Sequence, residues 1–431
     1  MKNTLIGFFL LFTFHVVSAQ NVLSIEDAKL LTLEYNFGIK IAKNNVQLAE
    51  NQTDRKVNGY LPTVSASGGL NGVVGGSSQI LSTGQENSVS NAFNWGADAS
   101  VRADYTLLDK RRDLSLAQLK ENLKLSNLEL TQTIEQNLLQ VYVSYYQLAL
   151  QMENVEVLTE SIEISKERLR RAKSQLEFGQ GSRLDVLNAE VDIKRDSVNL
   201  LNALLGVENE KRNLNFAIGR NASVDFDIVA STEIDHSLNL EELVANAKED
   251  NIALQINRQS LSVAKMDLDI IEAETKPTIS AGSSYDFRFS DNAEGSFIDR
   301  SNSRGLSGNL TVAWTLYDGS RDIRKQNSAL NLTNLKLQSE LVEQQLERDI
   351  INAWASYQNA LFILEVEESA VGTNLENFTR TEEQVKFGRL TSLEFRQAQL
   401  NLLNAQTSVN NARLNAKLAE IQLLALVGRL L

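Results

Sequence analysis

Two carboxylates occupy equivalent places in two short segments and are the best candidates for chemistry in this chain. Each segment starts with Phe-Gly, passes through a Ser or Thr, and reaches Asp185 in the first copy and Glu394 in the second. Each acid follows a hydroxyl residue by three positions, which is the spacing of a helix capping box. In a symmetric oligomer the same carboxylate would also be repeated around the axis, where a ring of acids concentrates cations and resists anions. Helix capping and a pore constriction are therefore both expected here, and capping alone is the alternative.

The remaining composition argues against an enzyme. Cysteine is absent, which excludes disulfides, thiolate metal sites and thiol nucleophiles. Beyond the N-terminal segment the single histidine is His236, in a polar linker, and Met152 and Met266 are too few to line a path for soft metal ions. No glycine-rich phosphate loop or nucleophile elbow is present, so we expect no catalysis, cofactor or metal. The net charge of −13 argues against nucleic acid as a partner.

The two acids belong to turns between long helices. Gly179 and Gly388 suit the left-handed position that ends a helix, and Ser182 and Thr391, three residues later, can cap the next helix. The two copies repeat at a spacing of 209 residues. We call these four residues and their neighbours the tip turns. They predict that the chain runs down one helix and back up another, twice.

A helical pattern of about seventy residues, or ~105 Å, precedes each tip turn. A heptad stripe along the lower part of both patterns is typical of a coiled-coil seam. Its members are Ile134, Val141, Leu148, Val155, Ile162, Leu169 and Leu176 in the first copy, and Ile350, Tyr357, Leu364, Val371, Phe378 and Val385 in the second. The returning helices, predicted over 183–219 and 392–428, are about half as long.

Two further helices, predicted over 23–58 and 238–276, end at the only prolines of the chain, Pro62 and Pro277. Proline disfavours helix in the residue before it and is tolerated at the start of a strand. The prolines therefore mark a switch from helix to strand.

Apolar and polar residues alternate after each proline, which predicts strand pairs over approximately 62–107 and 277–317. The polar segments around 80–92 and 290–303 read as exposed loops. The strands are long enough to cross a bilayer, which takes about 9–11 tilted residues. Aromatic residues near the strand ends fit an interfacial girdle, namely Trp95, Tyr105, Trp314 and Tyr317.

Four strands cannot close a membrane barrel by themselves. Only a closed barrel satisfies every backbone group in lipid, and about eight strands are the fewest that close. Several chains must then share one barrel. The alternative is a soluble sheet with one buried face.

The N-terminal 19 residues read as an export signal. Lys2 precedes an apolar run over residues 5–17, and a small-residue cleavage site follows at 17–19. The run is too short for a comfortable membrane-spanning helix. The duplication divides the remainder into a first structural repeat, 20–220, and a second, 221–431.

This duplicated order of helix, hairpin, long helix, tip turn and helix resembles the outer-membrane efflux proteins, the TolC-type exit ducts. The prolines before the strands and the glycines of the tip turns carry the resemblance, which covers essentially the whole mature chain. It implies a mainly helical fold, with a long α-helical coiled-coil barrel and four transmembrane β-strands per chain. It also implies a homotrimer with one twelve-stranded barrel in the outer membrane of a Gram-negative bacterium and a helical tunnel across the periplasm.

The same resemblance implies partners and a pore site. In such ducts the tip turns meet a periplasmic adaptor, or membrane fusion protein, which couples the duct to an inner-membrane pump of the RND or ABC type. The constriction maps onto Glu394 and, one turn later, Gln397, at a position that is commonly acidic in the family. The expected function is a passive exit duct for efflux or type I secretion. A periplasmic structural coiled-coil protein with a soluble β-sheet is the alternative.

Overall fold

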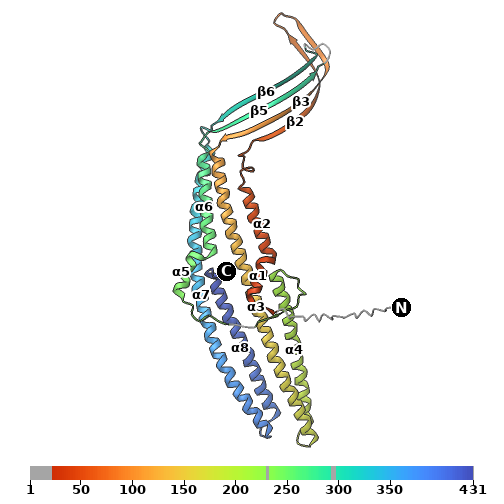
Figure 1. Ribbon diagram of the computed structural model, residues 1–431, viewed down its shortest axis with the longest axis vertical. Helices are drawn as coiled ribbons and strands as arrows, with labels where there is room; N and C mark the ends of the chain where they lie inside the picture. Colours follow the sequence, from red (N-terminus) through yellow and green to blue (C-terminus); the bar gives the residue numbers. More distant parts are fainter. Residues whose placement is uncertain (1–21, 230–232, 293–297, 431) are drawn as a thin grey trace, which may run out of the picture. The chain divides into compact units, whose positions relative to one another are not determined.

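The computed structural model describes residues 22–229, 233–292 and 298–430, and its elements follow one order twice (Figure 1). The first half contains α1 (Ile25–Tyr35), α2 (Phe37–Gln52), β2 (Thr63–Ile80), β3 (Glu86–Leu108), α3 (Lys110–Glu177) and α4 (Arg183–Ile218). The second half contains α5 (Leu240–Asp250), α6 (Ile252–Ala273), β5 (Thr278–Asp291), β6 (Arg300–Ala313), α7 (Gly319–Lys386) and α8 (Ser392–Leu426). The predicted export signal lies outside the described residues, and the repeat boundary at 220/221 stays a prediction.

The chain forms two compact units, and each unit draws on both halves of the sequence. The described residues within 1–40, 133–247 and 347–431 make up the first, which we call the tip unit. Residues 41–132 and 248–346 make up the second, the sheet unit. Both long helices contribute residues to both units. Within the described residues, no helix combines the length and the apolar character that crossing a membrane requires.

The single helices predicted over 23–58 and 238–276 are each two helices, so this part of the prediction was wrong. The chain leaves helical geometry at Asn36 and Asn251. Asn36 Oδ1 accepts a hydrogen bond from the Ile39 amide, and Asn251 Oδ1 accepts one from the Leu254 amide, both at 3.1 Å. Asparagine caps a helix well because its side chain satisfies an amide that has no intrahelical acceptor. The two breaks are therefore local capping events at equivalent positions.

The sheet unit contains one antiparallel sheet with the strand order β2-β3-β5-β6. The first strand of each pair begins one residue after a proline, as predicted: β2 at Thr63 and β5 at Thr278. Directly opposed residues of an antiparallel pair share a face. Val101 lies opposite both Ala66 and Tyr285, and the same face continues through other apolar pairs. We call this side of the sheet the apolar face.

The strands continue into segments that were predicted as loops, so the predicted loops over 80–92 and 290–303 were too long. The strand β3 already begins at Glu86, where it pairs with Ile80, and β6 begins at Arg300. Glycine, serine and asparagine favour turns, but an antiparallel partner supplies backbone hydrogen bonds to any residue type, and this context outweighs the local preference. Residues 293–297 of the second predicted loop lie outside the described residues.

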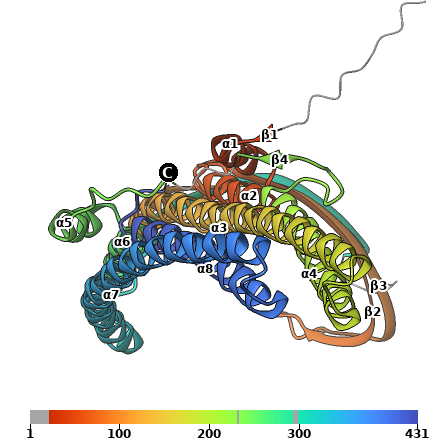
Figure 2. The ribbon, with the colours of Figure 1, turned by 90° about the horizontal axis from the view of Figure 1, so that it is seen from below.

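The main hydrophobic cluster of the tip unit lies around the middle of α3. Every member of the predicted heptad stripe is buried or half-buried, which confirms the seam on α3 and α7. In this unit α4 lies beside α3, and α8 beside α7 (Figures 1 and 2). Val141 and Leu148 of α3 pack with residues of α4, α8 and the short parallel strands β1 (Val22–Leu23) and β4 (Asp227–Ile228). The segment between α4 and α5, which contains His236, thus contributes the strand β4.

Candidate functional site at the tip turns

Each helix pair closes through a glycine in the left-handed conformation, as predicted. The φ angles are 72° at Gly179 and 70° at Gly388. The Gly179 amide donates to the Leu176 carbonyl at 3.1 Å, and the Gly388 amide donates to the Val385 carbonyl at 3.0 Å. No heavy atom beyond the adjoining residues lies within 4 Å of the place where a Cβ would stand on either glycine. Backbone conformation rather than crowding therefore selects glycine here.

Both predicted capping boxes are present. The Asp185 amide donates to Ser182 Oγ at 3.1 Å, and the Ser182 amide donates to the Asp185 carboxylate at 3.3 Å. The Glu394 amide donates to Thr391 Oγ1 at 3.2 Å, and the Thr391 amide donates to the Glu394 carboxylate at 2.7 Å. The backbone and hydroxyl hydrogen bonds from Thr391 lower the pKa of Glu394. Glu394 is therefore ionised at neutral pH, and its capping contribution is lost only as the pH falls through the lowered value.

Glu394 also begins an exposed stripe of polar side chains on α8. The polar stripe consists of Glu394, Gln397, Asn401, Asn404, Asn411 and Asn415, all of them exposed. The Gln397 amide donates to Asn401 Oδ1 at 2.8 Å, while Phe395 and Ala398 on the other side of α8 are buried. Glu394 is the one charged residue of this stripe. In a symmetric oligomer, the charge that the stripe adds to a ring around the axis would therefore come from Glu394.

The structure separates Asp185 from that stripe. Asp185 is half-buried and lines a cavity of about 330 Å³ between the two tip turns, together with Arg168, Arg171 and Phe395. Glu394 and Gln397 are not among the lining residues. The two predicted constriction acids thus have the same cap geometry and different surroundings.

The helix α4 exposes an apolar face that nothing in the described chain covers. Its members are between 44% and 65% exposed and follow helical spacing, namely Leu184, Leu187, Val191, Val198, Leu201 and Leu205. We call this set the apolar stripe. An apolar surface of this extent on a protein marks an interaction site.

A buried ion pair in the tip unit escaped sequence reasoning. Arg396 of α8 and Asp196 of α4 are 5% and 3% exposed, and the guanidinium donates to both carboxylate oxygens, at 2.6 and 2.8 Å. Gln399 donates to the Ser161 carbonyl at 2.8 Å, and Ser165 of α3 donates to Asp196 at 2.8 Å. These contacts tie α3, α4 and α8 together. The available signal was the charge of Arg396 between Phe395 and Ala398, on the mostly apolar face of α8.

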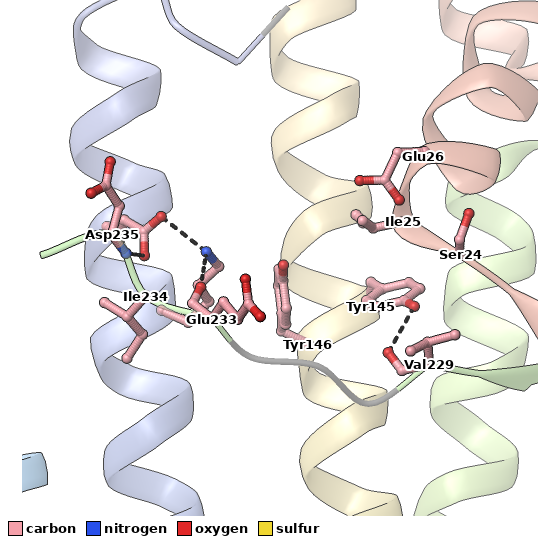
Figure 3. A pocket seen from close by; sticks show the side chains of 11 residues that line it. Ser24, Ile25, Glu26, Tyr145, Tyr146, Val229, Glu233, Ile234 and Asp235 are labelled. Carbon is pink, nitrogen blue, oxygen red and sulfur yellow. Dashed lines mark hydrogen bonds and ion pairs between the residues drawn. The ribbon is translucent and has the colours of Figure 1, made fainter. Parts of the chain in front are cut away.

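A second cavity in the tip unit, of about 550 Å³, is lined by residues of α1, α3, α8 and the linker (Figure 3). The Tyr145 hydroxyl donates to the Val229 carbonyl at 3.1 Å, and Lys417 donates to the Glu233 carbonyl at 2.6 Å and pairs with Glu420 at 2.9 Å. Burial and the nearby Glu420 raise the pKa of Tyr146 to about 12. These contacts hold the linker against the helices. His236 does not line this cavity, and no cluster among the described residues could hold a metal ion.

The sequence matches a family model described as outer membrane efflux protein, over residues 31–220 and 243–429. The two matched segments cover most of the chain and fall one in each half. No curated protein matches the chain.

Several solved structures share the fold over 94% of this chain. They include the outer-membrane channel OprN, with 16% identity, a TM-score of 0.74 and 89% of that chain covered. They also include VceC from Vibrio cholerae, with 13% identity, a TM-score of 0.70 and 96% of that chain covered. The open state of the Neisseria gonorrhoeae MtrE outer membrane channel has 17% identity, a TM-score of 0.69 and 89% of that chain covered. At these identities the likeness establishes a common, mainly helical fold with a small share of strands.

Proposed function

This chain belongs to the outer membrane efflux protein family, and from that premise we propose that it assembles as a homotrimer in the outer membrane and extends into the periplasm. Its function is that of an exit duct in a tripartite efflux system, a passive channel rather than an enzyme. The family match in both halves of the chain carries this conclusion. The exposed surfaces of α4, α8 and the sheet support the assembly.

The apolar stripe and the sheet edges both call for further copies of the chain. The stripe from Leu184 to Leu205 gains a partner if the next subunit packs against α4. The outermost strands, β2 and β6, leave unpaired backbone edges, which joining β6 to β2 of the next copy would satisfy. Three copies, the number typical of TolC-type ducts, give twelve strands, enough for a closed barrel.

The polar stripe suits the water-filled side of such an assembly. Three copies of Glu394 would form an acidic ring at the tip, with Gln397 beside it and Asp185 between the turns. The tip turns at Gly179, Ser182, Gly388 and Thr391 would dock a periplasmic adaptor, which connects the duct to an RND or ABC pump. Phe178 and Phe387 support this role because they are 74% and 77% exposed at the turns, where a partner can bury them.

An arginine at position 101 tests the lipid contact of the apolar face. Val101→Arg should cost about 2–4 kcal/mol if the residue lies near the bilayer midplane, because the guanidinium would meet hydrocarbon. Ser100→Arg, one residue away on the opposite face, should be much milder. The measurement is the amount of heat-modifiable, assembled protein in the outer-membrane fraction. Equal losses from both variants would contradict the assigned faces.

Planar-bilayer recordings test the duct and its acidic ring together. The assembled wild-type protein should give discrete conductance steps with a preference for cations, and Glu394→Gln should reduce that preference because it removes the one charge of the polar stripe. Glu177→Gln, which removes an exposed acid at the end of α3 away from the stripe, is the matched control. Assembled protein without conductance would count against the duct. Unchanged selectivity in Glu394→Gln would leave Glu394 as a helix cap only.

A further inference from the structure

On the apolar face of the sheet we infer a binding site for the phosphate group of an outer-leaflet glycolipid, built around Arg304. The inference rests on the proposed function, because it requires that the apolar face meet lipid. It goes beyond that function by assigning one position on the barrel surface to a lipid headgroup of stated chemistry.

The strand register puts Arg304 among apolar residues. Arg304 of β6 lies directly opposite Phe287 of β5, and Phe287 lies opposite Ala99 of β3. Directly opposed residues share a face, so Arg304 belongs to the same face as Leu306 and Leu310. Its side chain is exposed, and it makes no ion pair or hydrogen bond with any residue that the structure describes. The Arg304 guanidinium therefore has no counter-charge among the described residues and lies on the face that we assign to lipid.

The depth of Arg304 fits the boundary of the membrane rather than its middle. Trp314 follows β6 at the end nearest α7, and about ten residues separate it from Arg304. At about 3.3 Å per residue and a tilt of about 40°, this span covers ~25 Å along the membrane normal. That height equals the apolar band of outer-membrane barrels, which has aromatic girdles at both boundaries. With the helices in the periplasm, Trp314 marks the inner boundary and Arg304 the outer one.

The neighbours of Arg304 have the character of an interfacial girdle. The rings of Phe289 and Trp95 lie 5.2 Å apart, and the Arg300 guanidinium lies 5.9 Å from the Phe289 ring. Arg300 also pairs with Asp291 at 3.4 Å, so its charge is partly balanced. Asn302 lies opposite Phe289, between the two arginines on the same face of β6.

These donors suit a phosphate group. A guanidinium offers two parallel N–H groups that match phosphate oxygens, and Asn302 adds an amide donor beside it. An arginine on the lipid-facing side costs little near the interface, so Arg304 can remain there and reach the headgroups. The headgroups at the outer boundary are those of the outer leaflet, where the anionic groups are glycolipid phosphates.

The test is a lipid titration of the assembled protein, with lipid binding measured by native mass spectrometry. Wild type should bind diphosphorylated lipid A about tenfold more tightly than dephosphorylated lipid A. Arg304→Gln should lose most of this preference. Arg288→Gln is the matched control, because Arg288 lies on the same sheet but on the opposite face, across from Asp98 and Ser303. Millimolar inorganic phosphate should not compete, which distinguishes a lipid headgroup from a free anion.

Each outcome decides the matter. Equal binding of the two lipids by wild type, or equal loss in both arginine variants, overturns the site. Full competition by inorganic phosphate replaces the lipid site with a general anion site. The oligomer mass and the conductance are read from the same samples. Assembled, conducting protein without a lipid preference refutes the lipid site alone, whereas protein that neither assembles nor conducts refutes the proposed function.

Discussion

Asp196→Ala is expected to destabilise the tip unit by about 3–5 kcal/mol, because it removes the carboxylate that accepts two hydrogen bonds from the buried Arg396 guanidinium and leaves only Asp192, at 3.8 Å, as an ion-pair partner. Arg396 and Asp196 are nearly inaccessible to solvent, so water cannot replace the lost partner. The double replacement Asp196→Leu with Arg396→Met should restore most of the stability, since apolar residues can fill a buried ion-pair site without an unpaired charge. Thermal unfolding of the purified assembly, monitored by the circular dichroism signal of its helices, measures both effects.

The matched control for this prediction is an exposed ion pair. Glu376 and Arg380 pair on α7 with side chains 63% and 71% exposed, and Glu376→Ala should cost less than about 1 kcal/mol. If Asp196→Ala proves no worse than Glu376→Ala, the buried pair does not hold α4 and α8 together.

Gly219→Ala is expected to be the most harmful glycine replacement in the tip unit. Gly219 ends α4 at φ 88°, and an added Cβ would stand 2.6 Å from the Tyr35 carbonyl oxygen and 2.9 Å from Asn36 Cα. A left-handed alanine alone costs about 1–2 kcal/mol, and the collision with backbone atoms adds to this. The Asn36 side chain donates to the Ala217 carbonyl at 2.8 Å, so the clash would also disturb the contact between α4 and the break after α1.

Gly179→Ala provides the comparison for this variant. Gly179 has a similar φ of 72° but open space around the added Cβ, so only the conformational strain should appear. Hydrogen exchange should show faster opening of α1 and of the C-terminal turn of α4 in Gly219→Ala alone. Equal exchange in both variants would mean that the close approach of the Tyr35 carbonyl to Gly219 does not affect stability.

Features that depend on neighbours in the sequence were predictable. The left-handed glycines, the two capping boxes and the strand starts after Pro62 and Pro277 each follow from a few adjacent residues. The helix breaks at Asn36 and Asn251 are equally local, and their equivalent positions in the two repeats carried the missed signal. The loop lengths were harder, because strand pairing can hold polar residues that favour turns by themselves.

Contacts between distant segments could not be read from the pattern. Arg396 meets Asp196 across 200 residues of sequence, and a helical pattern shows only that Arg396 lies on the inner face of α8. The pairing of β1 with β4 and the different surroundings of Asp185 and Glu394 depend in the same way on how the helices pack. The sequence therefore identified the candidate acids and their caps, while the structure distinguished their positions.

The asparagines of the α8 stripe have a consequence for solutes moving through the assembled duct that we propose. Amide side chains exchange hydrogen bonds with water and with many solutes at similar energies, so they form no deep well in which a molecule would be retained. Conduction requires binding that is weak enough to release. Along Asn401, Asn404, Asn411 and Asn415 a solute would meet a nearly flat potential. Flux should then rise in proportion to the supply from the pump, without saturating, and the choice of cargo would belong to the pump.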